Sequence, residues 1–210
     1  MYRIYLDYAA TTPCDPKVVK AMSVFLKKDF GNPSSIHNFG QKASHSLGNA
    51  RQIVAEFLGC ESEEIVFTGS ATEANNLAIF GTIKAIKVQK PHVITSQIEH
   101  PSVLESFRAL EKQGAEVTYL PVDRDGIVKI FELEKALRPS TVLVSIMYAN
   151  NEIGAIQPIA EISEVIKKVN PKILFHTDAV QAANFLDCDV KKLGVDLLTL
   201  SSHKIYGPKG

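Results

Sequence analysis

The sequence predicts an α/β protein with a doubly wound, mostly parallel sheet. From about residue 40 onward, short runs rich in apolar residues alternate with stretches in which apolar residues recur at helical spacing. Most of the short runs are nearly continuous in apolar residues, which is typical of strands buried on both faces of a parallel sheet. Regular alternation of strands and helices favours a doubly wound sheet.

Six short runs are predicted to be strands. They cover residues 65–68, 92–96, 116–120, 141–148, 172–177 and 197–201. Helical spacing of apolar residues indicates four helices, within residues 43–58, 79–86, 103–110 and 159–169. Gly59 and Gly114 are placed to end the first and third of these helices, and Pro158 to begin the fourth. Before them, Asp15-Pro16 is typical of a helix start, and residues 31–35 are rich in turn formers.

Composition is that of an ordinary globular protein and argues against several functions. The chain is 45% hydrophobic and 22% charged, and 23 basic and 23 acidic residues give a formal net charge of zero. No basic stripe indicates direct nucleic-acid binding, and no apolar run approaches the ~20 residues of a membrane span. The first residues lack a secretory leader. Three cysteines without CxxC spacing support neither disulfides nor a zinc site, so we expect a cytoplasmic location and no metal.

The last predicted strand leads to a lysine that suits covalent chemistry. Residues 197–201 deliver Ser201, Ser202, His203 and Lys204 to a Gly/Pro turn. Open α/β sheets build their sites at the carboxyl ends of strands, and a lysine amine there can form a Schiff base with a carbonyl, as in enzymes of pyridoxal phosphate (PLP). The alternative is a solvated surface lysine.

The first predicted strand leads into a possible phosphate site. Residues 68–76 place small and hydroxyl side chains directly ahead of a helix, whose exposed N–H groups and positive dipole end favour an anion. The same residues also suit a plain capping box. Neither a P-loop nor a GxGxxG pattern is present.

Three further strand ends carry polar residues. Asp178 directly follows the fifth run, where a buried carboxylate needs a positive partner such as a protonated pyridine nitrogen; it could otherwise cap a helix. Gln181 could donate to the phenolic oxygen of the same ring. His100 follows the second run and could stack on a flat ring or move protons, although a lone histidine is often structural. Asn150 follows the fourth run, where its amide could make polar contacts to a ligand. Asparagine is also common in turns for purely conformational reasons.

These stretches together resemble the cysteine desulfurases of the NifS/IscS group, which belong to the class V aminotransferase-like PLP enzymes of fold type I. The resemblance covers essentially the whole chain, in the family's order and spacing. It rests on residues 5–12, 31–35 with His37, 67–76, 99–100, 149–154, 178–181 and 201–204.

The resemblance implies a role for each matched residue. Lys204 would hold PLP and move the substrate's protons, Asp178 would pair with the pyridinium, and His100 would stack on the ring and assist proton transfer. The phosphate would be bound by Ala71 and Thr72 with Ser201 and His203, and the phenolic oxygen by Asn150 and Gln181. Residues 1–14 would be an arm of the small domain, and residues 15–210 the large PLP-binding domain.

The family reaction takes sulfur from L-cysteine, leaves L-alanine and holds the sulfur as a persulfide, which feeds iron–sulfur cluster assembly or tRNA thiolation. The resemblance further implies a homodimer and a scaffold or sulfur-acceptor protein. Family members are roughly twice as long as this chain. We therefore expect a large domain that is incomplete at its carboxyl end, completed by further sequence or a second chain. That part would supply the persulfide cysteine and the substrate-binding arginine, and none of Cys14, Cys60 and Cys188 matches that cysteine.

Three alternatives remain open from the sequence. Another class V enzyme, such as a selenocysteine lyase, would share the same half of the fold. A catalytically inactive fragment could act as an assembly or interaction subunit. A TIM-barrel aldolase would also place a Schiff-base lysine at a strand end, but it needs eight strand–helix units where about six are counted.

Overall fold

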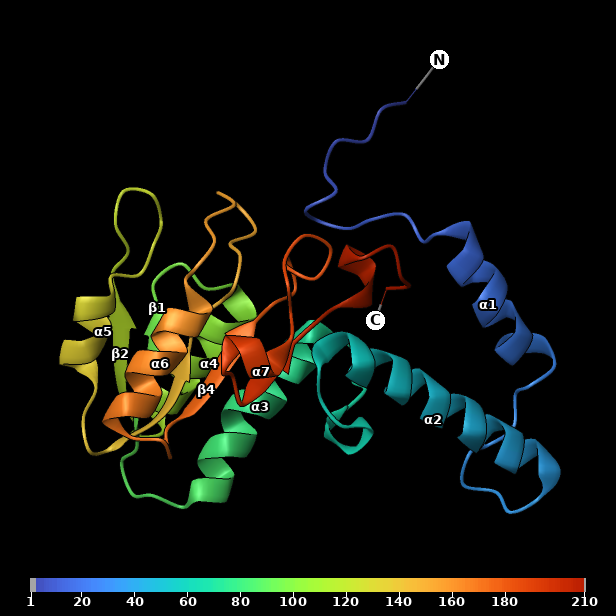
Figure 1. The fold of residues 1–210 in the computed structure, drawn as a ribbon, viewed down its shortest axis with the longest axis horizontal. Coiled ribbons are helices and arrows are strands. Elements are labelled where there is room, and N and C mark those ends of the chain that lie inside the picture. Colours follow the sequence, from blue (N-terminus) through green and yellow to red (C-terminus); the bar gives the residue numbers. More distant parts are fainter. Residues whose placement is uncertain (1–2, 210) are drawn as a thin grey trace. The chain divides into compact units, whose positions relative to one another are not determined.

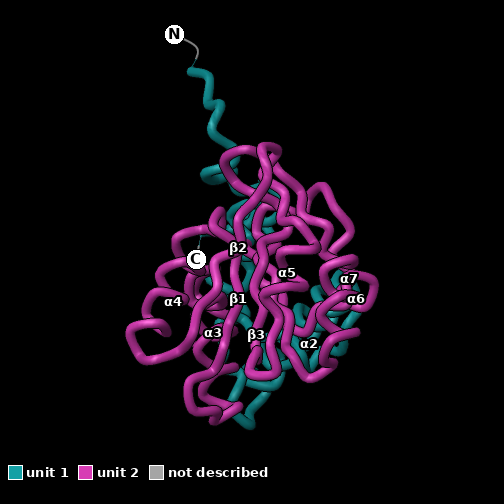
Figure 2. The backbone as a smooth tube through the Cα atoms, turned by 90° about the vertical axis from the view of Figure 1, so that its left-hand side faces the viewer, with its two compact units in different colours: residues 1–67, 202–210 teal, residues 68–201 magenta. Residues whose placement is uncertain are grey.

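The computed structural model describes residues 3–209, and its contacts divide the chain into two compact units (Figure 2). One unit holds residues 68–201, and the other holds residues 1–67 with 202–210. The two domains predicted from the sequence cover residues 1–14 and 15–210. The first two residues of one and the last residue of the other, residues 1–2 and 210, lie outside the described residues. The assignment of residues 1–14 to a small domain stays a prediction.

A five-stranded, all-parallel sheet forms the centre of residues 68–201 and confirms the predicted fold class. Its strand order is β2-β1-β3-β4-β5. The order reverses between β1 and β3, which makes the carboxyl ends of these two strands the switch point where such sheets bind ligands. Because the sheet is open, with β2 and β5 as its edges, the barrel alternative is excluded. The strands are β1 (His92–Ser96), β2 (Glu116–Leu120), β3 (Thr141–Ser145), β4 (Leu174–Asp178) and β5 (Leu197–Thr199).

The prediction of a strand at residues 65–68 is wrong. These residues have no regular secondary structure, and the side chains of Val66 and Phe67 are largely exposed. A strand needs a neighbour for its backbone N–H and C=O groups, and no described residue pairs with this run. The carbonyl of Ile65 instead accepts a hydrogen bond from the Arg51 guanidinium. The other five runs are strands, although β3, β4 and β5 differ from their predicted limits by one to three residues.

Helices cover both faces of the sheet (Figure 1). Helices α3 (Ala71–Ile86) and α4 (Pro101–Lys112) pack on one face, and α5 (Ile130–Ala136), α6 (Ile159–Val169) and α7 (Val190–Leu193) contact the strands or one another on the other face. Neighbouring strand residues point to opposite cores: Val93 lies in the cluster with Phe107, and Ile94 in the cluster with Ile162. Burial on both faces explains the nearly continuous apolar runs. Of the residues described, no helix has both the length and the apolar character needed to cross a bilayer.

Two buried histidines join strands across the sheet. The ring nitrogens of His92 on β1 lie 2.7 Å from Thr141 Oγ1 on β3 and 2.8 Å from Thr118 Oγ1 on β2. His176 on β4 makes the equivalent contacts to Ser145 on β3, at 2.8 Å, and to Thr199 on β5, at 3.1 Å. Burial lowers the pKa of His176 to about 4, so this ring is neutral near pH 7.

The other unit contains helices α1 (Pro16–Lys27) and α2 (Asn38–Leu58). The Asp15 carboxylate accepts from Lys17 N at 2.7 Å and caps α1, as predicted, while Gly59 ends α2 with a φ of 69°. Residues 3–14 are extended or turn-like and are joined to the end of the chain. Thr12 N donates to His203 O at 2.9 Å, and Thr12 Oγ1 accepts from Tyr206 N at 2.8 Å.

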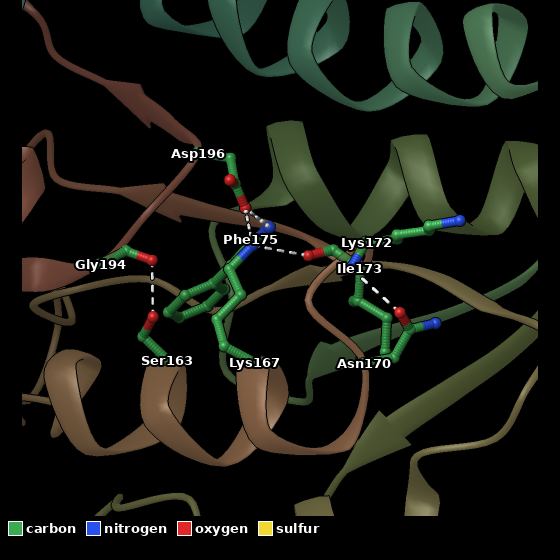
Figure 3. Close-up of polar contacts among 8 residues, drawn as sticks. All are labelled: Ser163, Lys167, Asn170, Lys172, Ile173, Phe175, Gly194 and Asp196. Atoms are coloured by element: carbon green, nitrogen blue, oxygen red, sulfur yellow. Dashed lines mark hydrogen bonds and ion pairs between the residues drawn. The ribbon is translucent and has the colours of Figure 1, made fainter.

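The amino-terminal ends of β4 and β5 are held by the Asp196 carboxylate (Figure 3). Its Oδ2 accepts from Phe175 N at 2.7 Å and from Lys167 Nζ on α6 at 2.6 Å. The same ammonium donates to Ile173 O at 2.8 Å. Asp196 therefore ties two strands and one helix through a single side chain.

We expect Asp196→Ala to lower the free energy of unfolding by about 1–3 kcal/mol, because it leaves the Phe175 N–H and the Lys167 ammonium without their acceptor. Urea unfolding followed by circular dichroism measures this. Glu105→Ala is the control, since its ion pair with Arg108 lies on an exposed helix surface. Equal unfolding midpoints for the two variants would contradict the role of Asp196.

Candidate active site

The parallel sheet brings four of the predicted site residues to one edge. His100 follows β1, Asn150 follows β3, Asp178 ends β4, and Ser201 follows β5. Because β1, β3, β4 and β5 are consecutive in the sheet and run in the same direction, their carboxyl ends lie together. The prediction that these strand ends share an edge is confirmed.

Asp178 is a buried carboxylate, 5% exposed, with N–H donors on both of its oxygens. Oδ1 accepts from Val180 N at 3.0 Å, and Oδ2 accepts from Asn75 Nδ2 at 2.8 Å. Turns rather than a helix follow at residues 180–184, so Asp178 does not cap a helix, which was the alternative interpretation. Its chemistry suits a carboxylate that receives a hydrogen bond from a protonated ring nitrogen.

His100 occupies the N-cap position of α4. Its Nδ1 accepts from Ser102 N at 3.1 Å and lies 2.8 Å from Ser102 Oγ. Ser102 Oγ in turn accepts from Asn75 Nδ2 at 2.9 Å. A continuous hydrogen-bonded chain therefore joins His100 to Asp178 through two buried side chains, Ser102 and Asn75.

The loop ahead of α3 forms the helix cap that its sequence suggests and leaves two backbone N–H groups for an anion. Ser70 Oγ accepts from Glu73 N at 3.2 Å, and the Glu73 carboxylate accepts from Gly69 N at 2.6 Å, which completes the cap of the helix. Among the hydrogen bonds of residues 3–209, none has the N–H of Ala71 or Thr72 as donor. These two groups at a helix N-terminus are available to a phosphate.

Asn150 and Gln181 lie in turns beside this edge. The Asn150 amide holds its own turn: Oδ1 accepts from Glu152 N and Ile153 N, and Nδ2 donates to Ile98 O at 2.9 Å. Its remaining amide hydrogen faces Met147 Sδ at 3.4 Å, a weak acceptor that a phenolic oxygen could replace. Gln181 is half-buried, three residues after Asp178.

Glu99 bridges the switch point of the sheet. Its Oε1 accepts from Ser96 Oγ on β1 at 2.6 Å and from Met147 N after β3 at 2.9 Å. Burial, with the charge of Asp178 nearby, raises the pKa of Glu99 to about 8, although the two hydrogen bonds act in the opposite direction. Glu99 is therefore mostly protonated near pH 7, and it joins the two strand ends as a neutral group.

Lys204 and His203 belong to the other unit, which holds residues 1–67 and 202–210. Lys204 Nζ donates to the carbonyls of Ala9 and Ala10 in the amino-terminal arm, the latter at 2.8 Å. His203 Nδ1 lies 3.1 Å from Thr11 Oγ1, and burial, then the Lys204 charge, lowers the pKa of His203. The arm thus contacts both residues that the sequence predicts for cofactor binding here.

Burial argues against a reactive thiolate at Cys188. Cys188 is 2% exposed, and burial, followed by the charge of Asp187, raises its pKa to about 11. Cys14 and Cys60 are half-buried, and neither forms a disulfide.

The donor set at the sheet edge fits PLP. Asp178 presents a buried acceptor for a pyridinium, the α3 terminus presents open N–H groups for a phosphate, and His100 lies at the same edge. The chain matches the family described as Aminotransferase class-V over residues 4–210. The chain belongs to the class V aminotransferase family.

The proteins that this chain matches agree with the resemblance to cysteine desulfurases found in its sequence. The cysteine desulfurase IscS of Dictyoglomus turgidum is 53% identical over 207 residues, which make up 99% of this chain and 52% of that protein. A solved NifS-like protein superimposes with a TM-score of 0.97 at 42% identity and covers 100% of this chain and 57% of its own. The structure of SspA in complex with cysteine gives a TM-score of 0.94 at 44% identity, over 98% of this chain and 59% of its own.

The recognised family and the fold are therefore confirmed. This class V aminotransferase chain spans about half the length of the curated relatives that it matches. Its sheet matches the fold of the NifS-like structure over that half.

Sequence reasoning missed three residues of this edge: Asn75, Ser102 and Glu99. Asn75 and Glu99 lay inside stretches that were noted for their neighbours, and Ser102 lies two residues after one of them. A signal was available for Asn75, because it shares the buried face of α3 with Ile79 and Thr82, four and seven residues on. An amide on a core-facing stripe needs a partner, and it was therefore a candidate.

We expect Glu99→Gln to flatten the pH dependence of stability between about pH 4.5 and 8. The pKa of Glu99 is higher in the folded than in the unfolded protein, so folding takes up a proton and stability falls as pH rises through this window. Glutamine keeps an acceptor for Ser96 and Met147 and does not ionise. The difference between variant and wild type should grow by up to about 1.4 kcal/mol per pH unit.

Urea unfolding at a series of pH values measures this difference. The low pKa of His176 affects both proteins equally and cancels in the comparison. Glu99→Ala serves as a contrast, because it removes the acceptor of Ser96 Oγ and Met147 N and should destabilise at every pH. If the free energy of unfolding had the same pH dependence in wild type and Glu99→Gln, folding would not raise the pKa of Glu99, and the prediction would be wrong.

Proposed function

We propose that the protein to which this chain belongs is a PLP-dependent cysteine desulfurase. The observation that carries the proposal is the buried Asp178 carboxylate, held by N–H donors at the same sheet edge as His100. PLP, when bound, supplies an electron sink that stabilises negative charge at the substrate's Cα. Asp178 would keep the ring nitrogen protonated, which that chemistry needs.

The other residues of this chain would bind and orient the cofactor and move protons. Ala71 and Thr72 would donate backbone N–H groups to the phosphate, and Ser201 and His203 would also bind it. Asn150 and Gln181 would contact the phenolic oxygen. His100 would cover one face of the ring. Lys204 would carry the cofactor on its amine and move protons at the substrate, roles that follow from its position after β5 in the family's order.

The printed names of the relatives support a choice of substrate for this proposal. SspA was solved in complex with cysteine, and the matching curated proteins are named cysteine desulfurases. We therefore assign L-cysteine as substrate, with L-alanine as product and the sulfur leaving as a cysteine persulfide. Burial makes Cys188 unsuited to carry that persulfide. A homodimer, a scaffold or sulfur-acceptor protein and a cytoplasmic location complete the proposal.

The whole protein should be yellow and should release alanine and sulfide from L-cysteine in the presence of a reductant. Lys204→Ala should abolish the visible absorption band and lower turnover by at least about a thousandfold, because the amine that carries the cofactor is gone. Lys172→Ala, an exposed lysine at the opposite end of β4, is the control and should retain both.

Other results would redirect the proposal. Bound PLP without sulfide from L-cysteine would exclude a desulfurase and leave PLP chemistry intact. Release of selenide from selenocysteine alone would identify a selenocysteine lyase. A colourless whole protein that binds no PLP would contradict the enzyme and favour an assembly subunit.

A further inference from the structure

Asn75 connects the two predicted ring contacts, Asp178 and His100. Its side chain is fully buried on α3, and Nδ2 lies 2.8 Å from Asp178 Oδ2 and 2.9 Å from Ser102 Oγ. A carboxylate can only accept, so the amide must present its NH₂ group to Asp178. Both amide hydrogens are then used, one for Asp178 and one for Ser102.

This orientation fixes the direction of the next hydrogen bond. Ser102 Oγ accepts from Asn75, and its own hydrogen is left to donate to His100 Nδ1, which lies 2.8 Å away. The backbone N–H of Ser102 also points at Nδ1, at 3.1 Å. A backbone N–H can only donate, so Nδ1 carries no proton in this arrangement. In the neutral ring the proton therefore lies on Nε2.

The chain of donors has a chemical consequence for both ends. At one end, a neutral His100 can donate from Nε2, because its Nδ1 accepts from Ser102. At the other end, Asp178 has N–H groups from Asn75 and Val180 on its two oxygens. Such an arrangement holds the plane of the carboxylate in place.

We propose that Asn75 and Ser102 are positioning residues, which hold Asp178 in orientation and His100 as the tautomer that bears its proton on Nε2. The proposal rests on the proposed function for its relevance to PLP, but each hydrogen bond of the chain joins residues of this protein alone. The proposal also adds to the role of His100, whose ring would donate hydrogen bonds through its Nε2–H group.

The first test is the tautomer of His100 in the whole protein freed of PLP. Histidine ring ¹⁵N NMR reports which nitrogen carries the proton, and His100→Gln assigns the signal. Wild type should show protonated Nε2 and unprotonated Nδ1. Ser102→Ala and Asn75→Leu should each raise the share of the Nδ1–H form. Ser102→Thr, which keeps a hydroxyl, should restore the wild-type pattern.

Ser106→Ala is the matched control for this test. Ser106 is a buried serine on the same helix, and its hydroxyl donates to Ser102 O, away from the chain that joins Asn75 to His100. It should leave the tautomer unchanged, although it removes an equally buried hydroxyl. An altered tautomer in Ser106→Ala, or an unaltered one in both Ser102→Ala and Asn75→Leu, would overturn the proposal.

The second test is the affinity for PLP, measured by titrating the cofactor-free whole protein and following its absorption. Asn75→Leu should weaken binding about tenfold, because Asp178 loses the donor that orients it. Ser102→Ala should weaken it less, and Ser106→Ala not at all. An unchanged affinity in Asn75→Leu would overturn the part of the proposal that concerns Asp178.

The two tests separate this proposal from the proposed function. A wild-type protein that binds no PLP would contradict the proposed function, and the tautomer measurement would still decide the role of Ser102 and Asn75. Where Asn75→Leu fails to fold, the difference between Ser102→Ala and Ser102→Thr decides it.

Discussion

The candidate site at the carboxyl ends of the strands depends on one constraint, the burial of the Asp178 carboxylate at the tip of the central strand β4. A carboxyl group with almost no contact to solvent must be met by hydrogen-bond partners, or its desolvation would oppose folding. The chain answers with a backbone N–H from the following turn and an amide from α3. The amide belongs to α3, which packs on α4. The hydrogen bond to Asp178 therefore links the end of β4 to these two helices.

A second buried carboxyl shows the opposite solution. Glu99 lies at the switch point between β1 and β3, and burial favours its neutral form. The two acidic side chains at this edge differ in their hydrogen bonds: Asp178 receives N–H donors on both oxygens, whereas one oxygen of Glu99 has no partner among the described residues. Environments that separate two carboxyl groups in this way are typical of functional sites.

The fold was predictable from the sequence where the physical signal was local. Continuous apolar runs indicated strands buried on both faces, and Asp15 and Gly59 marked helix ends by capping chemistry. Residues 65–68 have the same local pattern but no strand, because pairing is not a local property. The strand-end positions of His100, Asn150 and Asp178 followed from topology. The chain through Asn75 and Ser102 did not, because it depends on how α3 and α4 approach β4, which periodicity does not specify.

The two histidine bridges within the sheet have a consequence for how its strands align. Parallel strands that are apolar on both faces have few side-chain differences to oppose slippage, since a displaced strand would still bury hydrocarbon. A shift of β4 by one residue would carry the His176 ring to the opposite face and leave Ser145 and Thr199 without their partner. His92 imposes the same penalty on β1. Two buried imidazoles thus select a single alignment of the strands, and that alignment sets the height at which each strand tip delivers its functional side chain.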